Sequence, residues 1–417
     1  MCCNSEKIIG RIIKKNFIIM AQPLKKKETK KFNINDFKSS MGIAVESAKD
    51  IKKSNADKPL DWIVMPEAFQ EALKLPGIPC GYLSAVRGWS DTGKSTIKNC
   101  LIASAMRMGI LPIIFETEGN FDFTYARDCG MDIEPVYGDV EEVDEETGEA
   151  KLVNKIIDWK GNYILFTNNT ICEFCGDNDY STGTKKAKKR STAVIEDIAY
   201  IINTFLDKQD AGELPMPLLF VWDSVGSIQG WKSYQSKVGN PMFDAASLSA
   251  AFGPIINNRI PSSRQVGAPY TNSFFVVNKI WNDSMNSAMG LPSIELKGGK
   301  SFFYAIRLLI HVGGAAKAAT KKLKATLKGE EYQYGIVSKI SVAKNQLPSP
   351  YNITYNGTIC CVHNGLVSED KLDEYKKKCI PEIINRMRNI VGESKIGEVK
   401  TTDIQFTEDD EFGSDES

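Results

Sequence analysis

A phosphate-binding motif lies near the first quarter of the chain. The sequence G-W-S-D-T-G-K-S fits the pattern G-x-x-x-x-G-K-[ST], with Gly88, Gly93, Lys94 and Ser95 in the fixed positions. The glycines allow backbone N–H groups to turn toward a phosphate, and the following helix directs its positive dipole end at the same anion. In this pattern the lysine reaches the β- and γ-phosphates and the hydroxyl holds Mg²⁺. The spacing therefore predicts a nucleoside-triphosphate site.

The elements expected on either side of the motif support this interpretation. The apolar run Tyr82 to Val86 predicts a short buried strand, and Thr96 to Met108 predicts a helix. The order strand, loop, helix is the context in which this motif binds phosphate. A chance glycine-rich turn is the alternative.

Carboxylates follow two further apolar runs that we expect to form neighbouring strands. Leu111 to Phe115 is followed within three residues by Glu118, and Leu218 to Trp222 runs directly into Asp223. Ligands of parallel α/β sheets bind at the carboxyl edge of the strands. This placement suits Glu118 to act as a general base and Asp223 to enter the Mg²⁺ shell. The alternative for each is a solvated acid at the end of a strand.

The bulk composition is that of a globular protein. The 417 residues are 42% hydrophobic and 25% charged, with a formal net charge of zero, and could form one large α/β domain with additions or two to three domains. No run approaches 18 consecutive apolar residues, so we expect no membrane span and a cytoplasmic location. Ten cysteines suit a reducing compartment, and the C-x-x-C spacing of Cys172 and Cys175 leaves half a zinc site as the alternative to free thiols.

Changes in composition divide the chain into three expected parts. These are an N-terminal extension and oligomerisation segment at 1–60, an ATPase core at 61–366, and a C-terminal helix with an acidic disordered tail at 367–417. We expect an amphipathic helix at Phe32 to Lys53, packed on its own domain or on the next subunit. The core is expected to carry an inserted, largely exposed segment at about 138–190. Its basic run, Lys185 to Arg190, contacts nucleic acid or is a solvated face. No ordered structure is expected from Glu408 onward.

The chain after Asp223 mixes aromatic and basic residues before further strands. Gly226 to Asp244 has lysines interleaved with aromatic side chains, which suits contact with single-stranded nucleic acid by stacking and phosphate neutralisation. An ordinary loop is the alternative. Beyond it we expect strands at Ser273 to Val277, Phe302 to Val312, Gly335 to Val342 and Tyr351 to Tyr355, a lysine-rich loop at Lys317 to Lys328, and a charged helix at Leu372 to Arg388.

Together these motifs resemble the RecA-type recombinase family, including its phage UvsX-type members. The resemblance covers roughly Trp62 to Leu366, interrupted by the insertion, and its most specific stretch is E-G-N-F-D-F-T-Y-A-R-D-C-G-M-D-I, from Glu118 to Ile133. It implies an α/β fold with a RecA-like P-loop ATPase core, in which helices flank a twisted, mostly parallel sheet. It also implies ATP and Mg²⁺ as cofactors.

The resemblance implies a role for each residue of the nucleotide site. Glu118 activates the attacking water, Tyr125 stacks on adenine and Asp122 lies beside the base. The nucleotide-binding set is Gly88, Trp89, Ser90, Asp91, Thr92, Gly93, Lys94, Ser95, Thr96, Asp122, Tyr125 and Asp223, with Ser95 and Asp223 holding Mg²⁺.

Two lysines stand where relatives carry groups that sense or complete the site. Lys279 follows Asn278, at a position where relatives often have a glutamine or histidine as γ-phosphate sensor. In V-A-K-N-Q, Lys344 matches a lysine that reaches the neighbouring subunit's ATP, while Gln346 replaces the second of a lysine pair. The resemblance therefore gives Lys94, Glu118, Lys279 and Lys344 as the catalytic set.

The resemblance also places two DNA-binding loops. The first is Gly226 to Asp244, and the second is Trp281 to Lys297, followed by G-G-K-S-F-F-Y-A-I-R at 298–307. The implied DNA contacts are Lys237, Phe243 as an apolar wedge between bases, Met285, Gly298, Gly299 and Lys300. In the helix expected after the first loop, Leu248 and Ile255 stand where relatives tend to have DNA-facing arginines.

The activity implied is DNA recombination and repair driven by ATP. The chain would assemble as a helical filament on single-stranded DNA and exchange strands with homologous duplex DNA, in the bacterial host cytoplasm if it is phage-encoded. Single-strand binding and loader proteins are further candidate partners. Two alternatives remain open: a ring-forming helicase or motor with the same core, and a recombination mediator that binds ATP without hydrolysing it.

Overall fold

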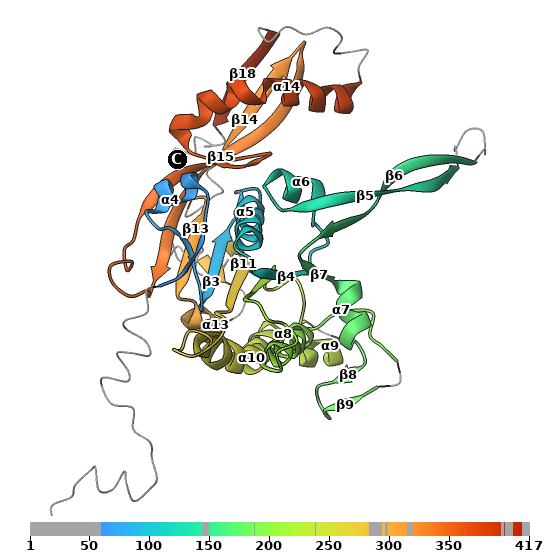
Figure 1. Ribbon diagram of the computed structural model, residues 1–417, viewed down its shortest axis with the longest axis vertical. Helices are drawn as coiled ribbons and strands as arrows, with labels where there is room; N and C mark the ends of the chain where they lie inside the picture. The colour runs from blue at the N-terminus through green and yellow to red at the C-terminus, as the bar shows by residue number, and fades with distance from the viewer. Residues whose placement is uncertain are drawn as a thin grey trace, which may run out of the picture. The chain divides into compact units, whose positions relative to one another are not determined.

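The apolar runs lie side by side in one central sheet (Figure 1). The computed structural model describes residues 60–410, apart from 144–149, 187, 238, 283–293, 297–298, 315–319, 393–395 and 397–402. Within these residues the central sheet has 12 strands. The main path across it is β17-β16-β15-β13-β3-β11-β10-β4-β7, with β12 pairing with β11, β14 with β15, and β18 with β14. The N-terminal extension and the helix expected at Phe32 to Lys53 lie outside the described residues.

Six neighbouring strands of this sheet are parallel. In order they are β13 (Leu308–Val312), β3 (Leu83–Gly88), β11 (Ser273–Asn282), β10 (Leu218–Asp223), β4 (Leu111–Glu116) and β7 (Ile164–Thr167). Because both faces of a parallel sheet are covered, its strands consist of nearly continuous apolar runs. The α/β fold with a mostly parallel block flanked by helices is thus confirmed, and the carboxyl ends of these strands share one edge.

Alternate residues of each parallel strand enter two separate cores. On β10, Leu219 and Val221 pack with α5 (Lys94–Arg107), whereas Phe220 and Trp222 pack with α8 (Ile195–Asp210) and α10 (Pro241–Pro254) on the other face. The first core also takes side chains from α4 (Glu67–Leu73) and from the two-stranded sheet of β1 (Trp62–Val64) and β2 (Gly77–Pro79).

An antiparallel wing continues the sheet beyond β13. Its strands are β14 (Thr320–Leu327), β15 (Glu330–Asn345), β16 (Asn356–Val362), β17 (Gly365–Val367) and β18 (Ile404–Asp410), and α14 (Leu372–Val391) packs on them after a 3₁₀ turn, Glu369–Lys371. The lysine-rich loop expected at Lys317 to Lys328 was wrong, since Thr320–Leu327 forms a strand. Its Leu323, Ala325 and Leu327 are buried in the core, whereas Lys324 and Thr326 between them are half-buried.

Three further expectations in this half of the chain were wrong. The strand expected at Tyr351 to Tyr355 begins only at Asn356. The run Phe302 to Val312 starts inside α13 (Gly299–Ala305), and the strand β13 occupies only its second half. The tail is not without structure from Glu408, because β18 extends to Asp410 and pairs with β14; residues 411–417 lie outside the described part.

The segment expected as an exposed insertion consists of two unlike parts. β5 (Ile133–Val143) and β6 (Ala150–Gly161) form a mostly exposed hairpin that projects beyond the sheet in Figure 1. β7 and α7 (Asn168–Cys175) instead return to the core, where Ile171 and Cys175 are buried. The segment at 138–190 is largely exposed, as expected, except where β7 and α7 pack into the core.

The remaining described elements are short. They are α6 (Phe123–Asp128), β8 (Asn178–Asp179), β9 (Thr184–Lys185), α9 (Trp231–Ser236), a π-helical turn (Ile255–Arg259), α11 (Ile260–Ser262) and β12 (Ile294–Leu296). None of the helices in the described part of the chain has the length and apolar character needed to span a membrane.

Removing β18 should destabilise the wing, whereas removing only the residues after it should not. A chain ending at Thr402 loses the buried Ile404 and the edge-to-face contact between Phe406 and Tyr334, whose ring centres are 5.5 Å apart. We expect its free energy of unfolding to fall by roughly 2–4 kcal/mol, while a chain ending at Asp410 keeps its stability. Urea unfolding of both chains tests this, and equal midpoints would contradict it.

Candidate nucleotide-binding site

The phosphate-binding loop joins β3 to α5. Gly88 is the last residue of β3, and Gly93 caps the N-terminus of α5 with φ 94°. A Cβ atom on Gly93 would lie 2.3 Å from the Cys361 Sγ, so a side chain is excluded there by conformation and by space. The sequence motif thus folds as the strand–loop–helix unit that its spacing predicts.

Lys94 is turned back onto the loop that precedes it. Its Nζ donates a hydrogen bond to the Trp89 carbonyl, which also accepts from the Thr92 hydroxyl at 2.9 Å. The Trp89 indole in turn donates to the Gly314 carbonyl at 3.2 Å. Burial lowers the pKa of Lys94 to about 8, although Asp223 opposes the shift. A phosphate oxygen is the stronger partner for this buried ammonium.

A buried ion cluster lies behind the loop. The Lys98 Nζ is 2.6 Å from Asp223 Oδ2 and 3.4 Å from Glu116 Oε2, and all three residues are buried. Burial by itself lowers the pKa of Lys98, but the two carboxylates outweigh it and the net shift is upward. Burial raises the pKa of Glu116. The cluster ties α5 to the ends of β4 and β10.

Sequence reasoning missed Lys98. Its position four residues after Lys94 places both lysines on the same face of α5. That spacing, together with two carboxylates at neighbouring strand ends, is the signal that could have identified it.

Glu118 lies two residues beyond β4 and is held by two donors. Lys279 Nζ donates to its Oε2 at 2.6 Å, and the Ser224 hydroxyl donates to its Oε1. Burial alone raises the pKa of Glu118, but these two hydrogen bonds more than offset it and the pKa is lowered. Glu118, Ser224 and Lys279 line a cavity of about 450 Å³ with Thr117 and Asn120. The structure therefore brings the expected base and the expected sensor together.

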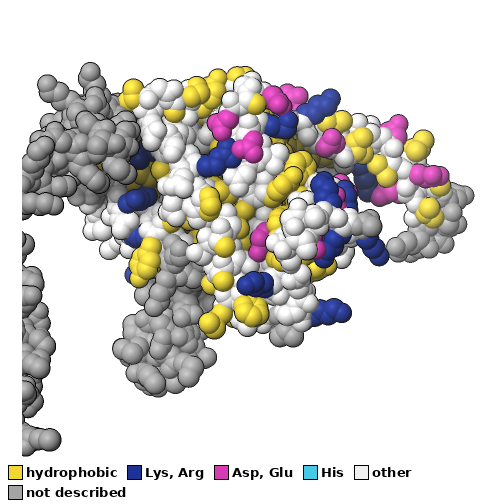
Figure 2. Space-filling model, turned by 90° about the horizontal axis from the view of Figure 1, so that it is seen from below, with side chains coloured by type: hydrophobic (Ala, Val, Ile, Leu, Met, Phe, Trp, Pro, Cys, Tyr) yellow, Lys and Arg dark blue, Asp and Glu magenta, His cyan; other side chains and the backbone are white. Residues whose placement is uncertain are grey.

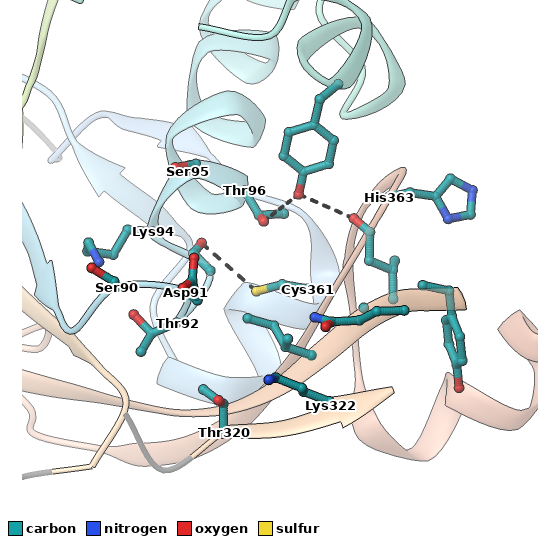
Figure 3. A pocket seen from close by; sticks show the side chains of 17 residues that line it. Ser90, Asp91, Thr92, Lys94, Ser95, Thr96, Thr320, Lys322, Cys361 and His363 are labelled. Atoms are coloured by element: carbon teal, nitrogen blue, oxygen red, sulfur yellow. Dashed lines mark hydrogen bonds between the residues drawn. The ribbon is translucent and has the colours of Figure 1, made fainter. Parts of the chain in front are cut away.

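A second cavity, of about 660 Å³, opens on the other side of the loop (Figure 3). Figure 3 shows Ser90, Asp91 and Thr92 on one side, with Cys361 and His363 across from them. The opposite wall comes from the antiparallel wing, more than 200 residues later in the chain. Its residues, which no motif indicated, are Thr320, Lys322, Gln333, Tyr334, Gly335, Ile336, Cys361, Val362 and His363.

Asp122 and Tyr125 lie at the N-terminal end of α6, beside this cavity. The Tyr125 hydroxyl is 2.5 Å from the Thr96 Oγ1 and donates to the Val362 carbonyl at 3.4 Å. Asp122 caps α6 by accepting from the Tyr125 backbone N–H at 2.9 Å. Tyr125 lines the cavity, whereas Asp122, which was expected beside the base, caps the helix that carries Tyr125.

Ser95 and Asp223 fit a magnesium ion by their chemistry. Ser95 is exposed on the first turn of α5, and Asp223 uses only Oδ2 toward Lys98. A hydroxyl and one carboxylate are ligands that Mg²⁺ accepts, since it takes its others from phosphate and water. Within the described residues, no group of three or more His, Cys, Asp or Glu side chains lies close enough together to hold a metal ion. Cys172 and Cys175, which were considered as half a zinc site, are free thiols buried on α7.

Lys344 lies away from the site of its own chain. It pairs with Leu309 near the start of β13, whereas the phosphate-binding loop follows the far end of β3. Its Nζ donates to the carbonyls of Phe303 and Tyr304, both at 2.9 Å, at the end of α13. Lys344 thus contributes nothing to the cavities around Lys94.

The residues expected to touch DNA are only partly placed. Lys237 ends α9 with φ 56°, and Phe243 is 41% exposed on the first turn of α10. Gly299 and Lys300 begin α13, while Met285 and Gly298 lie outside the described residues. Leu248 and Ile255, which match arginine positions of relatives, are fully buried in the core beneath the sheet.

Removing the buried cation should cost more stability than removing an exposed one. Lys98→Met leaves Glu116 and Asp223 facing each other without a counter-charge, so we expect a loss of about 3–5 kcal/mol in the free energy of unfolding. Adding Glu116→Gln should recover part of that loss. Lys160→Met, on the exposed face of β6, is the matched control. Denaturant unfolding of the four chains measures this, and equal stability of Lys98→Met and the control would refute it.

Comparison with known proteins finds similarity over one short stretch. No protein-family model matches the chain. The RecA protein of Roseiflexus castenholzii is 33% identical over 78 residues, 17% of this chain and 22% of that protein. The RecA proteins of Herpetosiphon aurantiacus (32% over 85 residues; 20% and 23%) and Heliobacterium modesticaldum (36% over 67 residues; 16% and 19%) match similarly. The chain spans about a fifth of the length of these curated relatives, and over that stretch it is similar to RecA.

Proposed function

We propose that this chain is an ATP-dependent DNA recombinase of the RecA type. It assembles on single-stranded DNA as a helical filament and catalyses homologous pairing and strand exchange. The observation that carries the proposal is the convergence of Lys94, Asp223 and Glu118, with Ser95, at the shared carboxyl edge of β3, β4 and β10. The similarity to RecA proteins adds DNA as the partner.

In this proposal each residue has a distinct task at the triphosphate. The loop N–H groups and Lys94 bind the β- and γ-phosphates, and Tyr125 provides an aromatic surface for the base. Glu118 holds the proton of the attacking water as general base. Bound Mg²⁺, held by Ser95 and Asp223, would neutralise charge on the phosphate oxygens.

The Glu118–Lys279 ion pair links the nucleotide to the second DNA loop. The pair lines one cavity, and Lys279 lies on β11 two residues before Trp281, where the expected second loop begins. A γ-phosphate competes with Glu118 for the Lys279 ammonium, because each is an anion within reach of one flexible cation. Nucleotide binding would thereby free the base and move the strand that leads into the loop.

A neighbouring subunit completes the site in this proposal. Lys344 lies far from its own phosphate-binding loop, and in this proposal it reaches the nucleotide of a second protomer. Residues 1–60 are proposed as the segment that joins protomers. Two alternatives differ from the filament-forming recombinase. A motor with the same core would assemble as a closed ring, and a mediator that binds ATP without hydrolysing it would not need Glu118 as a general base.

ATP hydrolysis with and without single-stranded DNA, combined with electron microscopy of the same mixtures, tests the proposal. We expect filaments, and hydrolysis that rises when DNA is added. Glu118→Gln should lower kcat by about 10²- to 10⁴-fold while ATP still binds, and Lys94→Ala should abolish ATP binding. Glu134→Gln, on the exposed hairpin, is the matched control. Closed rings would favour the motor, and unchanged activity in Glu118→Gln would favour the mediator.

The ion pair also predicts a change in the pH profile. Lys279 lowers the pKa of Glu118, so Lys279→Gln should raise that pKa and reduce the carboxylate fraction at a given acidic pH. We expect the acidic limb of kcat/KM, which reports the enzyme before the nucleotide binds, to move upward by about one pH unit. The profile of Lys160→Gln should match that of the unmodified chain. An unmoved limb in Lys279→Gln would show that Glu118 does not titrate in catalysis.

A further inference from the structure

A basic hairpin, here defined as the described residues of 177–190, carries the shorter strand pair β8 and β9. It contains four exposed lysines, namely Lys185, Lys186, Lys188 and Lys189. Two aspartates, Asp177 and Asp179, balance only part of this positive charge. Neither the nucleotide site nor the central sheet uses these lysines. Their neighbours in space decide what they can do.

Arg190 anchors the basic hairpin in the protein interior. Its guanidinium is 2.5 Å from Asp197 Oδ1 and donates to the Asn178 carbonyl at 2.7 Å. Asp197 also accepts from the Tyr180 hydroxyl at 2.7 Å. Both members of the ion pair are buried, and the added hydrogen bonds to Asn178 and from Tyr180 help to offset the cost of burying the two charges. The basic hairpin is therefore fixed in place.

The basic hairpin packs directly on helix α9. The Arg190 guanidinium lies 5.0 Å from the centre of the Trp231 ring, and the Trp231 indole donates to the Ser181 hydroxyl at 2.6 Å. Lys186 Nζ lies 4.7 Å from the same ring. Gln235, also on α9, donates to Ser181 at 3.0 Å. Helix α9 belongs to the segment 226–244, which is the expected first DNA loop.

The lysines remain available to an outside anion. Lys185 is 3.3 Å from Asp177 and Lys186 is 3.3 Å from Asp179, and the Lys189 ammonium donates to the Glu173 carbonyl. The side chains of Lys185 and Lys186 are 68% and 46% exposed, and ion pairs of exposed lysines are weak. Figure 2 views the molecule from below, toward the side of Figure 1 on which β8, β9 and α9 lie, and shows Lys and Arg side chains in groups on the surface. A phosphate backbone, with one charge per nucleotide, competes well against such pairs.

We propose that the basic hairpin binds the phosphate backbone of the single-stranded DNA held by segment 226–244. This inference rests on the proposed DNA-binding function and extends it to residues outside both expected loops. Lysines on phosphates fix the position of the strand and carry no sequence information. The aromatic and apolar side chains of the loop, such as Phe243, are left to contact the bases.

A charge-neutral triple variant tests the inference. Lys185→Gln/Lys188→Gln/Lys189→Gln removes three charges from the basic hairpin, and Lys151→Gln/Lys155→Gln/Lys160→Gln removes three from β6 as the matched control. Fluorescence anisotropy measures binding of each full-length chain to labelled oligo-dT across a salt series. We expect the hairpin variant to bind about 10- to 100-fold more weakly at about 0.1 M salt, with the slope of log K against log salt reduced by about 2. The control should keep both values.

Three results separate failure of this inference from failure of the proposed function. Binding by the unmodified chain, with loss only in the hairpin variant, supports the inference. Equal affinity and equal salt slope in the two triple variants overturns it and leaves DNA binding intact. No binding of oligo-dT by the unmodified chain overturns both. The thermal unfolding midpoint of each variant is measured as well, and a midpoint equal to that of the unmodified chain shows that the fold is retained.

Discussion

The site depends on a buried cation that two carboxylates require. Glu116 and Asp223 end neighbouring parallel strands, whose register brings the two residues opposite each other. Two such acids cannot both stay ionised away from water unless a positive group lies between them. Lys98 supplies that charge from α5, and its contacts fix the helix against both strands. The same helix carries Lys94, so the distance between the phosphate-binding loop and Asp223 is set by this cluster.

The parallel strands could be predicted from the sequence because a strand that is buried on both faces appears as a continuous run of apolar residues. Leu111 to Phe115 and Leu218 to Trp222 each fall one residue short of the strands β4 and β10. The antiparallel wing left a weaker record in the sequence: the strand expected at Gly335 to Val342 lies within β15, but β14 was expected as a loop. In Thr320–Leu327 one face is solvated, and its lysines made the segment resemble a loop although Leu323 and Leu327 are buried. When only one face of a strand is buried, only alternate residues need be apolar, so the strand is harder to recognise in the sequence.

The candidate site divides in the same way. Gly88 to Ser95, Glu118 and Asp223 were expected from local motifs, and the structure brings them to one edge. The far wall of the larger cavity could not be expected, because Cys361 lies on β16 and His363 in the turn after it, and the position of β16 depends on long-range pairing with β15. A motif describes chemistry that neighbours in sequence perform, whereas a cavity wall is a product of the whole fold.

The two lysines nearest the acids differ in what they allow. Lys98 has 4% of its side chain exposed and contacts two carboxylates, while Lys279 has 43% exposed and pairs with Glu118. A ligand shifts an equilibrium only by its different affinity for the two states. Moving Lys98 would leave buried charges uncompensated, which costs more than a phosphate contact returns. Lys279 can exchange Glu118 for a phosphate at little cost, so a nucleotide-dependent change would begin at β11 rather than at α5.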